Sequence, residues 1–209
     1  MSEVLLIGSG LSAKLIAHNE TIFKDMTVVA VNHGHLVCDY WSYWVHAPDY
    51  KGQKPVLTPD QIEVYRYAKI LDRYGGHRAC GYSIMLCASY WALDTLKPKK
   101  MYYLGADMNY TPQPDGSTHI YGVGLDIKKG QPDPDRMAKM YAAKGQEPAE
   151  YLREVYMRFY NIAVEKGVEV FNLSDDPQSR LPYPKKSIQE LVLDKIVENN
   201  ENPGLYDSI

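Results

Sequence analysis

The sequence has no long apolar run and little charge imbalance. No stretch approaches the roughly 18 consecutive apolar residues of a transmembrane helix, and no charged segment of a secretory signal precedes the first strand. The formal net charge is −3, so the chain lacks the basic balance with which proteins neutralise several nucleic-acid phosphates. A nucleic-acid substrate is still compatible with this charge. We expect a cytoplasmic protein without membrane insertion.

Cysteine and phenylalanine are scarce, with three residues of each. Cys38, Cys80 and Cys87 have neither metal-ligand spacing nor the density of a secreted disulfide framework, which favours a reducing compartment. The chain has 18 tyrosines. Because tyrosine joins an apolar ring to a polar tip, these residues either replace phenylalanine in a shallow core or line polar ligand pockets.

Apolar strands alternate with helical segments along the 209 residues. Apolar runs predict buried strands at 4–7 and 26–31. Further strands are predicted in the aromatic-rich segment at 44–46, at 101–104 before Gly105, and at 168–173. Helical patterns, caps and first-turn prolines predict helices at 12–17, 58–74, 80–96, 147–166 and 187–199. Such alternation is typical of a parallel sheet. We predict an α/β fold: a single Rossmann-like, nucleotide-binding domain over residues 1–200, with a mainly parallel sheet flanked by helices and a C-terminal tail at 201–209.

Residues 106–146 form a long segment with little periodicity. They are rich in proline, glycine and aspartate, and a loop of this length inside a domain is usually functional. Asp133 and Asp135 resemble a D-x-D metal motif, but a proline-rich turn gives the same string. His33, His35 and His46 have no spacing that aligns them as metal ligands. We therefore predict no required metal.

The turn Gly8-Ser9-Gly10 joins the first strand to the first helix and is the clearest functional motif. Glycines let a backbone approach a ligand, and a helix N-terminus offers N–H groups to a phosphate. Ser12 follows in the same segment. Dinucleotide enzymes place an acid after the second strand, whereas this chain has Asn32, which disfavours NAD. Asn32 either contacts a phosphate, ribose or base, or is a turn residue in the left-handed conformation.

Two further segments point to the carboxyl edge of the sheet, where α/β proteins bind ligands. Cys80, Gly81 and Ser83 lie at a turn into the central helix and are candidates for nucleotide contact; a single nearby histidine makes Cys80 more typical of a structural thiol than of a nucleophile. Ser174 and Arg180 follow the last strand, and arginine binds phosphate bidentately. An ordinary Asp-Pro turn with a surface arginine explains them equally well.

Three residues are candidates for catalysis. Asp107 ends the fourth predicted strand at the same edge, where it could order a ligand hydroxyl or the loop itself. His119 and Tyr121 lie in a glycine-bounded segment of the long loop. Because histidine exchanges protons near neutral pH, His119 is the leading general base; a loop histidine bonded to the backbone is the alternative.

Several of these segments, in this order, resemble a superfamily of Rossmann-like proteins. The matching strings are VLLIGSGLS at 4–12, VAVN at 29–32, CGYS at 80–83 and YYLGADM at 102–108, followed by the helix and strand of 151–174. The superfamily contains bacterial sialyltransferases that use CMP-sugars, motility-associated glycosyltransferase-like proteins, archaeal hydroxymethylpterin pyrophosphokinases and bacteriophage proteins of unknown role.

The resemblance implies a site as well as a fold. In the sialyltransferases the first loop, the asparagine after the second strand and a Ser-Gly turn hold the donor, without a metal. Carried over, donor contacts fall on Gly8, Gly10, Ser12, Asn32, Gly81 and the backbone of Cys80. The serine or threonine expected before Gly81 is Cys80 here. The sialyltransferase base is a histidine in the loop after the Gly-x-Asp strand, a place that His119 takes in different surroundings.

These observations lead to one expected function and two alternatives. The expected function is transfer of a sugar from a nucleotide-sugar co-substrate to an acceptor hydroxyl on a glycan, small molecule or nucleic acid, with no further cofactor. One alternative is Mg²⁺-dependent pyrophosphoryl transfer from ATP to a small alcohol. The other is a non-catalytic nucleotide-binding or interaction protein of phage origin. The sequence leaves the donor, the acceptor and the oligomeric state open.

Overall fold

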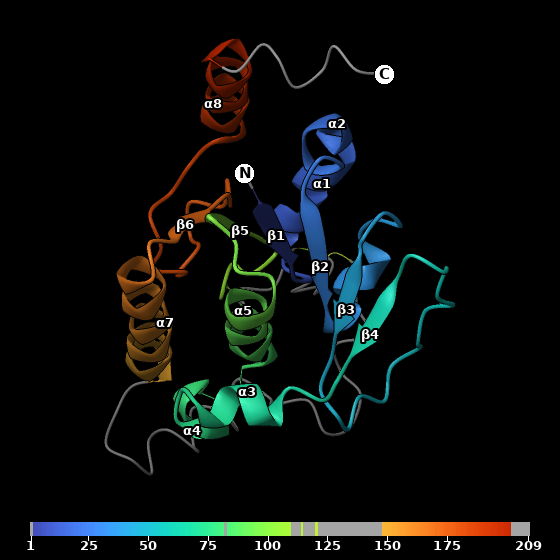
Figure 1. The fold of residues 1–209 in the computed structure, drawn as a ribbon, viewed down its shortest axis with the longest axis vertical. Helices are drawn as coiled ribbons and strands as arrows, with labels where there is room; N and C mark the ends of the chain where they lie inside the picture. The colour runs from blue at the N-terminus through green and yellow to red at the C-terminus, as the bar shows by residue number, and fades with distance from the viewer. Residues whose placement is uncertain (1, 82, 110–113, 115–119, 121–147, 202–209) are drawn as a thin grey trace.

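The computed structural model describes residues 2–81, 83–109, 114, 120 and 148–201 (Figure 1). In these residues six strands form one sheet: β1 (Glu3–Ile7), β2 (Thr27–Val31), β3 (Tyr43–Val45), β4 (Ile62–Val64), β5 (Lys100–Leu104) and β6 (Glu169–Asn172). The strand order is β4-β3-β2-β1-β5-β6, and every pairing is parallel. The prediction of an α/β fold with a parallel sheet and flanking helices is therefore confirmed.

Helices and short 3₁₀ turns connect the strands. They are η1 (Leu11–Lys14), α1 (Leu15–His18), α2 (Glu20–Phe23), η2 (Asn32–Leu36), α3 (Ala68–Asp72), α4 (Gly76–Ala79), α5 (Ile84–Thr95), α7 (Pro148–Glu165) and α8 (Ile188–Glu201). No helix in the described ranges is long and apolar enough to cross a membrane. Successive strands from β1 to β4 are added on one side of β1, and β5 then starts the other side. The side of the sheet on which strands are added thus changes between β1 and β5, although the two strands run parallel.

The sheet is buried on both faces, which explains its continuous apolar strands. Alternate residues of β1 belong to different cores: Val4 and Leu6 pack in the cluster that contains α5 and α7, whereas Leu5 and Ile7 pack with η1, α1 and α2. Central helix α5 is apolar on nearly all sides, from Met85 to Leu93, because it lies between the sheet and α7.

The prediction of a helix over 58–74 is wrong for the first half of this range. Residues 58–74 contain strand β4, and only the short helix α3 follows it. Thr58 does not begin a helix; its N–H donates to the side chain of Gln61, and the N–H of Gln61 donates back to the Thr58 carbonyl. This turn directs Ile62 and Val64, two β-branched residues, onto the open edge of β3.

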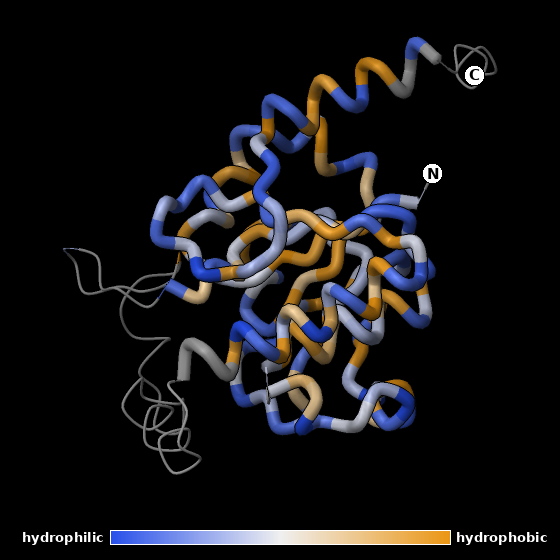
Figure 2. Tube along the Cα trace, turned by 90° about the vertical axis from the view of Figure 1, so that its left-hand side faces the viewer, coloured by the Kyte–Doolittle hydropathy of each residue, from blue (hydrophilic) through white to orange (hydrophobic). Residues whose placement is uncertain are grey.

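Helix α8 begins with a capping box formed by Ser187 and Glu190. The Ser187 hydroxyl accepts from the Glu190 N–H at 3.2 Å, and the Glu190 carboxylate accepts from the Ser187 N–H at 2.7 Å. Figures 1 and 2 show α8 extending beyond the sheet. Its anchors to the body include the fully buried Leu191 and an ion pair of 3.0 Å between Lys195 and Glu3.

Tyrosines fill the core beside α5, as the phenylalanine-replacement interpretation predicts. Tyr90 and Tyr103 are both fully buried. Tyr103 donates to the Ser89 hydroxyl at 2.8 Å, which in turn donates to the Met85 carbonyl. The Tyr90 hydroxyl has no hydrogen-bond partner among the described residues, and burial raises its pKa to about 12.

Removing the two hydroxyls should therefore have opposite effects. We expect Tyr90→Phe to raise the free energy of unfolding by about 1 kcal/mol, because it removes a buried polar group without a partner. Tyr103→Phe should lower it by about 1 kcal/mol, since it removes a satisfied bond. Urea denaturation of the matched pair measures both, and a loss of stability in Tyr90→Phe would contradict the assignment.

Candidate functional site

The loops that follow β1 and β5 are joined to each other at the carboxyl edge of the sheet. The N–H of Gly8 donates to the Leu104 carbonyl, and that of Gly10 donates to the Gly105 carbonyl, both at 2.8 Å. Two buried polar side chains complete the contact. The Asp107 carboxylate accepts from the Ser12 N–H at 3.0 Å and from the Ser12 hydroxyl at 2.5 Å, and that hydroxyl accepts from the Gly105 N–H at 2.8 Å.

This contact explains both glycines of the Gly8-Ser9-Gly10 turn. A Cβ on Gly8 would lie 2.2 Å from the Gly105 carbonyl oxygen, and one on Gly10 would lie 2.6 Å from an Asp107 carboxylate oxygen. Both distances are far below van der Waals contact. Glycine at both positions therefore lets the two loops approach each other, and the N–H groups of both glycines are already hydrogen-bonded within the protein. Ser9 is different: it is half-buried, and no residue in the described part of the chain bonds its hydroxyl.

The N-terminus of α5 lies beside this turn. A Cβ on Gly8 would lie 3.0 Å from the methyl carbon of Met85 in the first turn of α5. Ser83 is the N-cap residue, yet its hydroxyl bonds the Tyr156 hydroxyl at 3.0 Å and does not cap the helix. Gly81 has a left-handed backbone with φ 55°, and Cys80 before it is fully buried. The helix N-terminus is thus free of a side-chain cap at the sheet edge.

The loop after β6 packs on the Asp107 loop. The Arg180 N–H donates to the Asp107 carbonyl at 2.8 Å. Ser174 is buried and structural: its N–H donates to the Asn172 side chain, and its hydroxyl accepts from the Asp176 N–H. Arg180 is exposed, and its guanidinium has no ion-pair partner among the residues that the structure describes. Its backbone is thus held against the Asp107 loop at the carboxyl edge of the sheet.

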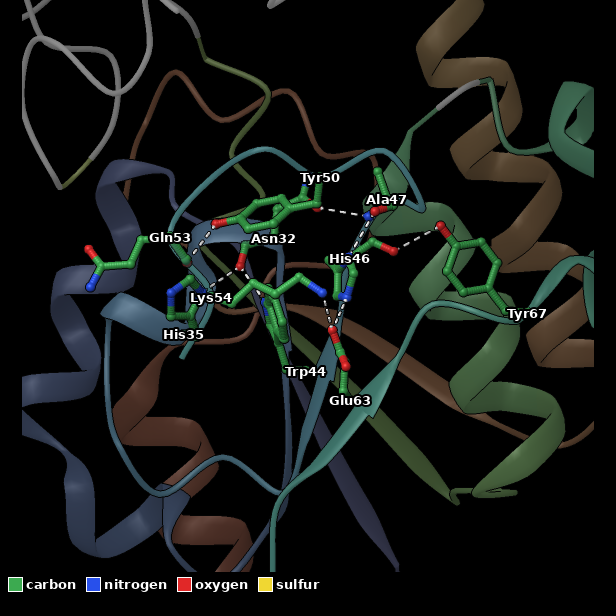
Figure 3. Close-up of polar contacts among 10 residues, drawn as sticks. All are labelled: Asn32, His35, Trp44, His46, Ala47, Tyr50, Gln53, Lys54, Glu63 and Tyr67. Atoms are coloured by element: carbon green, nitrogen blue, oxygen red, sulfur yellow. Dashed lines mark hydrogen bonds and ion pairs between the residues drawn. The ribbon is translucent and has the colours of Figure 1, made fainter. Parts of the chain in front are cut away.

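Asn32 has the left-handed conformation, with φ 48°, as its interpretation as a turn residue predicts. Its backbone carbonyl accepts from the Trp44 indole at 2.7 Å and contacts His35 Nδ1 at 2.8 Å. Its side-chain oxygen accepts from the Ala47 N–H at 3.2 Å. Figure 3 shows these bonds. Asn32 thereby fixes the loops that follow β2 and β3.

Beyond Asn32 lies a cluster of aromatic and histidine rings that sequence reasoning missed. Trp44 and His46 stack with ring centroids 4.1 Å apart, and Tyr50 contacts both rings. His46 reaches the Glu63 carboxylate at 2.9 Å, and Lys54 pairs with the same carboxylate at 2.7 Å (Figure 3). The register of β3 and β4, which was not predicted, brings Glu63 opposite Trp44.

This cluster is closed. His46 is buried, and its second ring nitrogen contacts the Ala47 carbonyl at 2.8 Å, so neither nitrogen is left to act as a base. Burial lowers the pKa of His35. No group of three potential metal ligands occurs within the described ranges. The cluster therefore stabilises the edge of β2, β3 and β4.

The remaining predicted residues, His119, Tyr121, Asp133 and Asp135, lie outside the described residues. So does most of the predicted 106–146 loop; its residue Ile120 donates its N–H to the Ser9 carbonyl at 3.0 Å. The residue next to His119 in sequence is thus bonded to the Gly8-Ser9-Gly10 turn.

Comparison with protein-family models, with curated proteins and with solved structures finds no significant match to this chain.

The Asp107–Ser12 contact can be tested by a change of one atom. Asp107→Asn keeps the shape but replaces one acceptor oxygen by an NH₂ group, so a buried Ser12 donor loses its partner. We expect the free energy of unfolding to fall by about 1–3 kcal/mol, measured by urea denaturation. Asp175→Asn, at an exposed position in the β6 loop, is the control. Equal stability of the two variants would contradict this structural role of Asp107.

Proposed function

We propose that this protein binds a nucleotide-activated sugar at the carboxyl edge of β1 and β5 and transfers the sugar to an acceptor hydroxyl. The observation that carries the proposal is that the order of strand addition reverses between these two strands. Open parallel α/β sheets bind their ligands in the crevice at such a point. This arrangement also favours the Rossmann-like assignment and a functional role for the 106–146 loop.

The polar groups at this point suit the phosphates of a nucleotide. The uncapped N-terminus of α5 offers N–H groups and the positive end of its dipole. Arg180 adds a charge that binds phosphate in a bidentate manner, and Ser9 adds a hydroxyl. Because the amides of Gly8, Gly10 and Ser12 are engaged within the protein, we assign the phosphate contacts to Ser9, Arg180 and the first turn of α5.

Transfer requires a stabilised leaving group and a base. The nucleotide phosphate is the leaving group, and preorganised donors that stabilise its developing charge are usually the largest catalytic contribution. We keep His119 as the base that deprotonates the acceptor. Asp107 is assigned a positioning role, because its carboxylate is buried and already accepts two hydrogen bonds from Ser12. Because these two hydrogen bonds occupy the carboxylate, Asp107 is also disfavoured as a Mg²⁺ ligand in a pyrophosphokinase.

Nucleotide binding can be tested by thermal shift with CMP, UDP, GDP and ATP. A ligand that binds only the native state stabilises it by about 2.7 kcal/mol at 100 times its Kd. We expect one of these nucleotides to raise the unfolding temperature. In Arg180→Ala, loss of a charged hydrogen bond of about 1.5–3 kcal/mol should weaken that affinity roughly 10–100-fold.

The matched control is Arg153→Ala, which removes an exposed arginine from α7 and should leave nucleotide affinity unchanged. Equal affinity in both variants would remove Arg180 from the site. No shift with any of the four nucleotides would overturn the proposed function itself. A shift with ATP and an activity lost in EDTA would replace it by the pyrophosphokinase alternative.

The role of His119 separates transfer from binding. We expect His119→Ala to lower turnover of the nucleotide-sugar by about 10²–10⁴-fold, the usual contribution of a general base, without a change in nucleotide affinity. His18→Ala, at an exposed position at the end of α1, should retain full turnover. Sugar release is measured by chromatography of the freed nucleotide. Unchanged turnover in His119→Ala would exclude this residue as the base, and nucleotide binding without any turnover of the unmodified protein would favour the non-catalytic alternative.

A further inference from the structure

The serine at the start of α5 does not cap its helix. Ser83 is the N-cap residue, with an extended backbone at φ −83° and ψ 121°. Serine is among the preferred N-cap residues because its hydroxyl accepts a hydrogen bond from an N–H of the first helical turn. The Ser83 hydroxyl makes no such bond. It bonds the Tyr156 hydroxyl of α7 at 3.0 Å, so a contact between two helices replaces the cap of α5.

The first turn of α5 therefore keeps its own donors unpaired. The N–H groups of Ile84, Met85 and Leu86 have no hydrogen-bond partner in the described part of the chain. The helical bonds begin with the Cys87 N–H, which donates to the Ser83 carbonyl at 3.0 Å. A cap by the Ser83 hydroxyl would occupy the N–H at the second or third helical position, which is Met85 or Leu86.

The core fixes the position of the Tyr156 hydroxyl. The Tyr156 side chain is only 4% exposed and belongs to the buried cluster that contains Phe159 of the same helix. Its ring lies beside the Tyr183 ring, with centroids 5.9 Å apart. A ring packed in this way has one orientation, whereas a serine hydroxyl turns about a single bond. The Tyr156 hydroxyl thus decides where the Ser83 hydroxyl points.

The turn that Tyr156 keeps uncapped borders the glycine loop after β1. A Cβ on Gly8 would lie 3.0 Å from the methyl carbon of Met85, so the start of α5 and this loop are immediate neighbours. A side-chain cap and the oxygen of a phosphate use the same N–H groups of a helix N-terminus. The two therefore compete, and a serine that caps α5 would take a donor away from a phosphate.

We propose that Tyr156 is a positioning residue of the nucleotide site: by holding the Ser83 hydroxyl on α7, it keeps the first turn of α5 available to a phosphate. This inference rests on the proposed function, which assigns a phosphate contact to that turn. Tyr156 is buried and acts only through Ser83. Loss of the Tyr156 hydroxyl should therefore weaken nucleotide binding because it lets α5 acquire an ordinary cap.

The test compares Tyr156→Phe, Ser83→Ala and the double variant by calorimetric titration with whichever of CMP, UDP, GDP and ATP gives the largest thermal shift. In Tyr156→Phe the Ser83 hydroxyl is released to cap α5, and we expect nucleotide affinity to fall about tenfold, as for the loss of one charged hydrogen bond. Ser83→Ala cannot cap and should bind as tightly as the unmodified chain. Adding Ser83→Ala to Tyr156→Phe should restore the affinity.

Restoration by the second change distinguishes positioning from a general loss of packing. If Tyr156→Phe weakens binding and the double variant stays equally weak, the proposal is wrong, and it is also wrong if Tyr156→Phe binds normally. Tyr160→Phe is the matched control. It removes a half-buried hydroxyl from α7, one turn further on, that makes no hydrogen bond to a described residue, and it should leave the affinity unchanged.

Amide hydrogen exchange without nucleotide separates failure of this inference from failure of the proposed function. In Tyr156→Phe the new cap bond should slow exchange of the Met85 or Leu86 N–H about fivefold, and Ser83→Ala in the same chain should remove that slowing. If no nucleotide binds the unmodified chain, the proposed function fails, whereas slowed exchange still supports control of the cap by Tyr156. Nucleotide binding with no slowing in Tyr156→Phe overturns the present inference alone.

Discussion

The carboxylate of Asp107 holds together the loops at the carboxyl ends of β1 and β5, between which the order of strand addition reverses. Through Ser12 this carboxylate connects the loop after β1 to the loop after β5. The backbone carbonyl of Asp107 accepts a hydrogen bond from the Arg180 N–H in the loop after β6. Gly8 and Gly10 must lack a Cβ for this approach. Each of these groups is buried or hydrogen-bonded, so the edge has its shape before any ligand arrives. Such preorganisation reduces the entropy that a ligand must give up when it binds.

The contact also changes the interpretation of the glycine turn. A Gly-x-Gly string after a strand indicates that another backbone comes close, but it does not say whether that backbone belongs to a ligand or to the protein. Here it belongs to the loop of Gly105, because the N–H groups of Gly8 and Gly10 donate to the carbonyls of Leu104 and Gly105. For this reason the proposed function assigns the phosphate to Ser9, Arg180 and the α5 N-terminus, whose polar groups take no part in this contact.

Much of the fold was predictable because it depends on local patterns. Strands buried on both faces gave continuous apolar runs, and Ser187 and Glu190 had the spacing of the capping box that they form. Strand β4 was missed because Pro59 and Asp60 imitate a helix start, whereas pairing with β3 decided its structure. The Ser12–Asp107 bonds join residues 95 positions apart, and no local pattern encodes such a pair. The same holds for Glu63 and His46, which meet only through the register of two strands.

The two halves of the carboxyl edge differ in a way that decides where a ligand fits. Over β2, β3 and β4 the edge is filled by Trp44, His46 and Tyr50. The Asn32 oxygens accept from the Trp44 indole and the Ala47 N–H, and the two ring nitrogens of His46 contact Glu63 and the Ala47 carbonyl. Over β1, β5 and β6 the loops hydrogen-bond to one another, whereas Arg180 is exposed and α5 begins without a side-chain cap. Since a buried polar group binds a ligand only when it is not already paired, the proposed function assigns the phosphate to the second half.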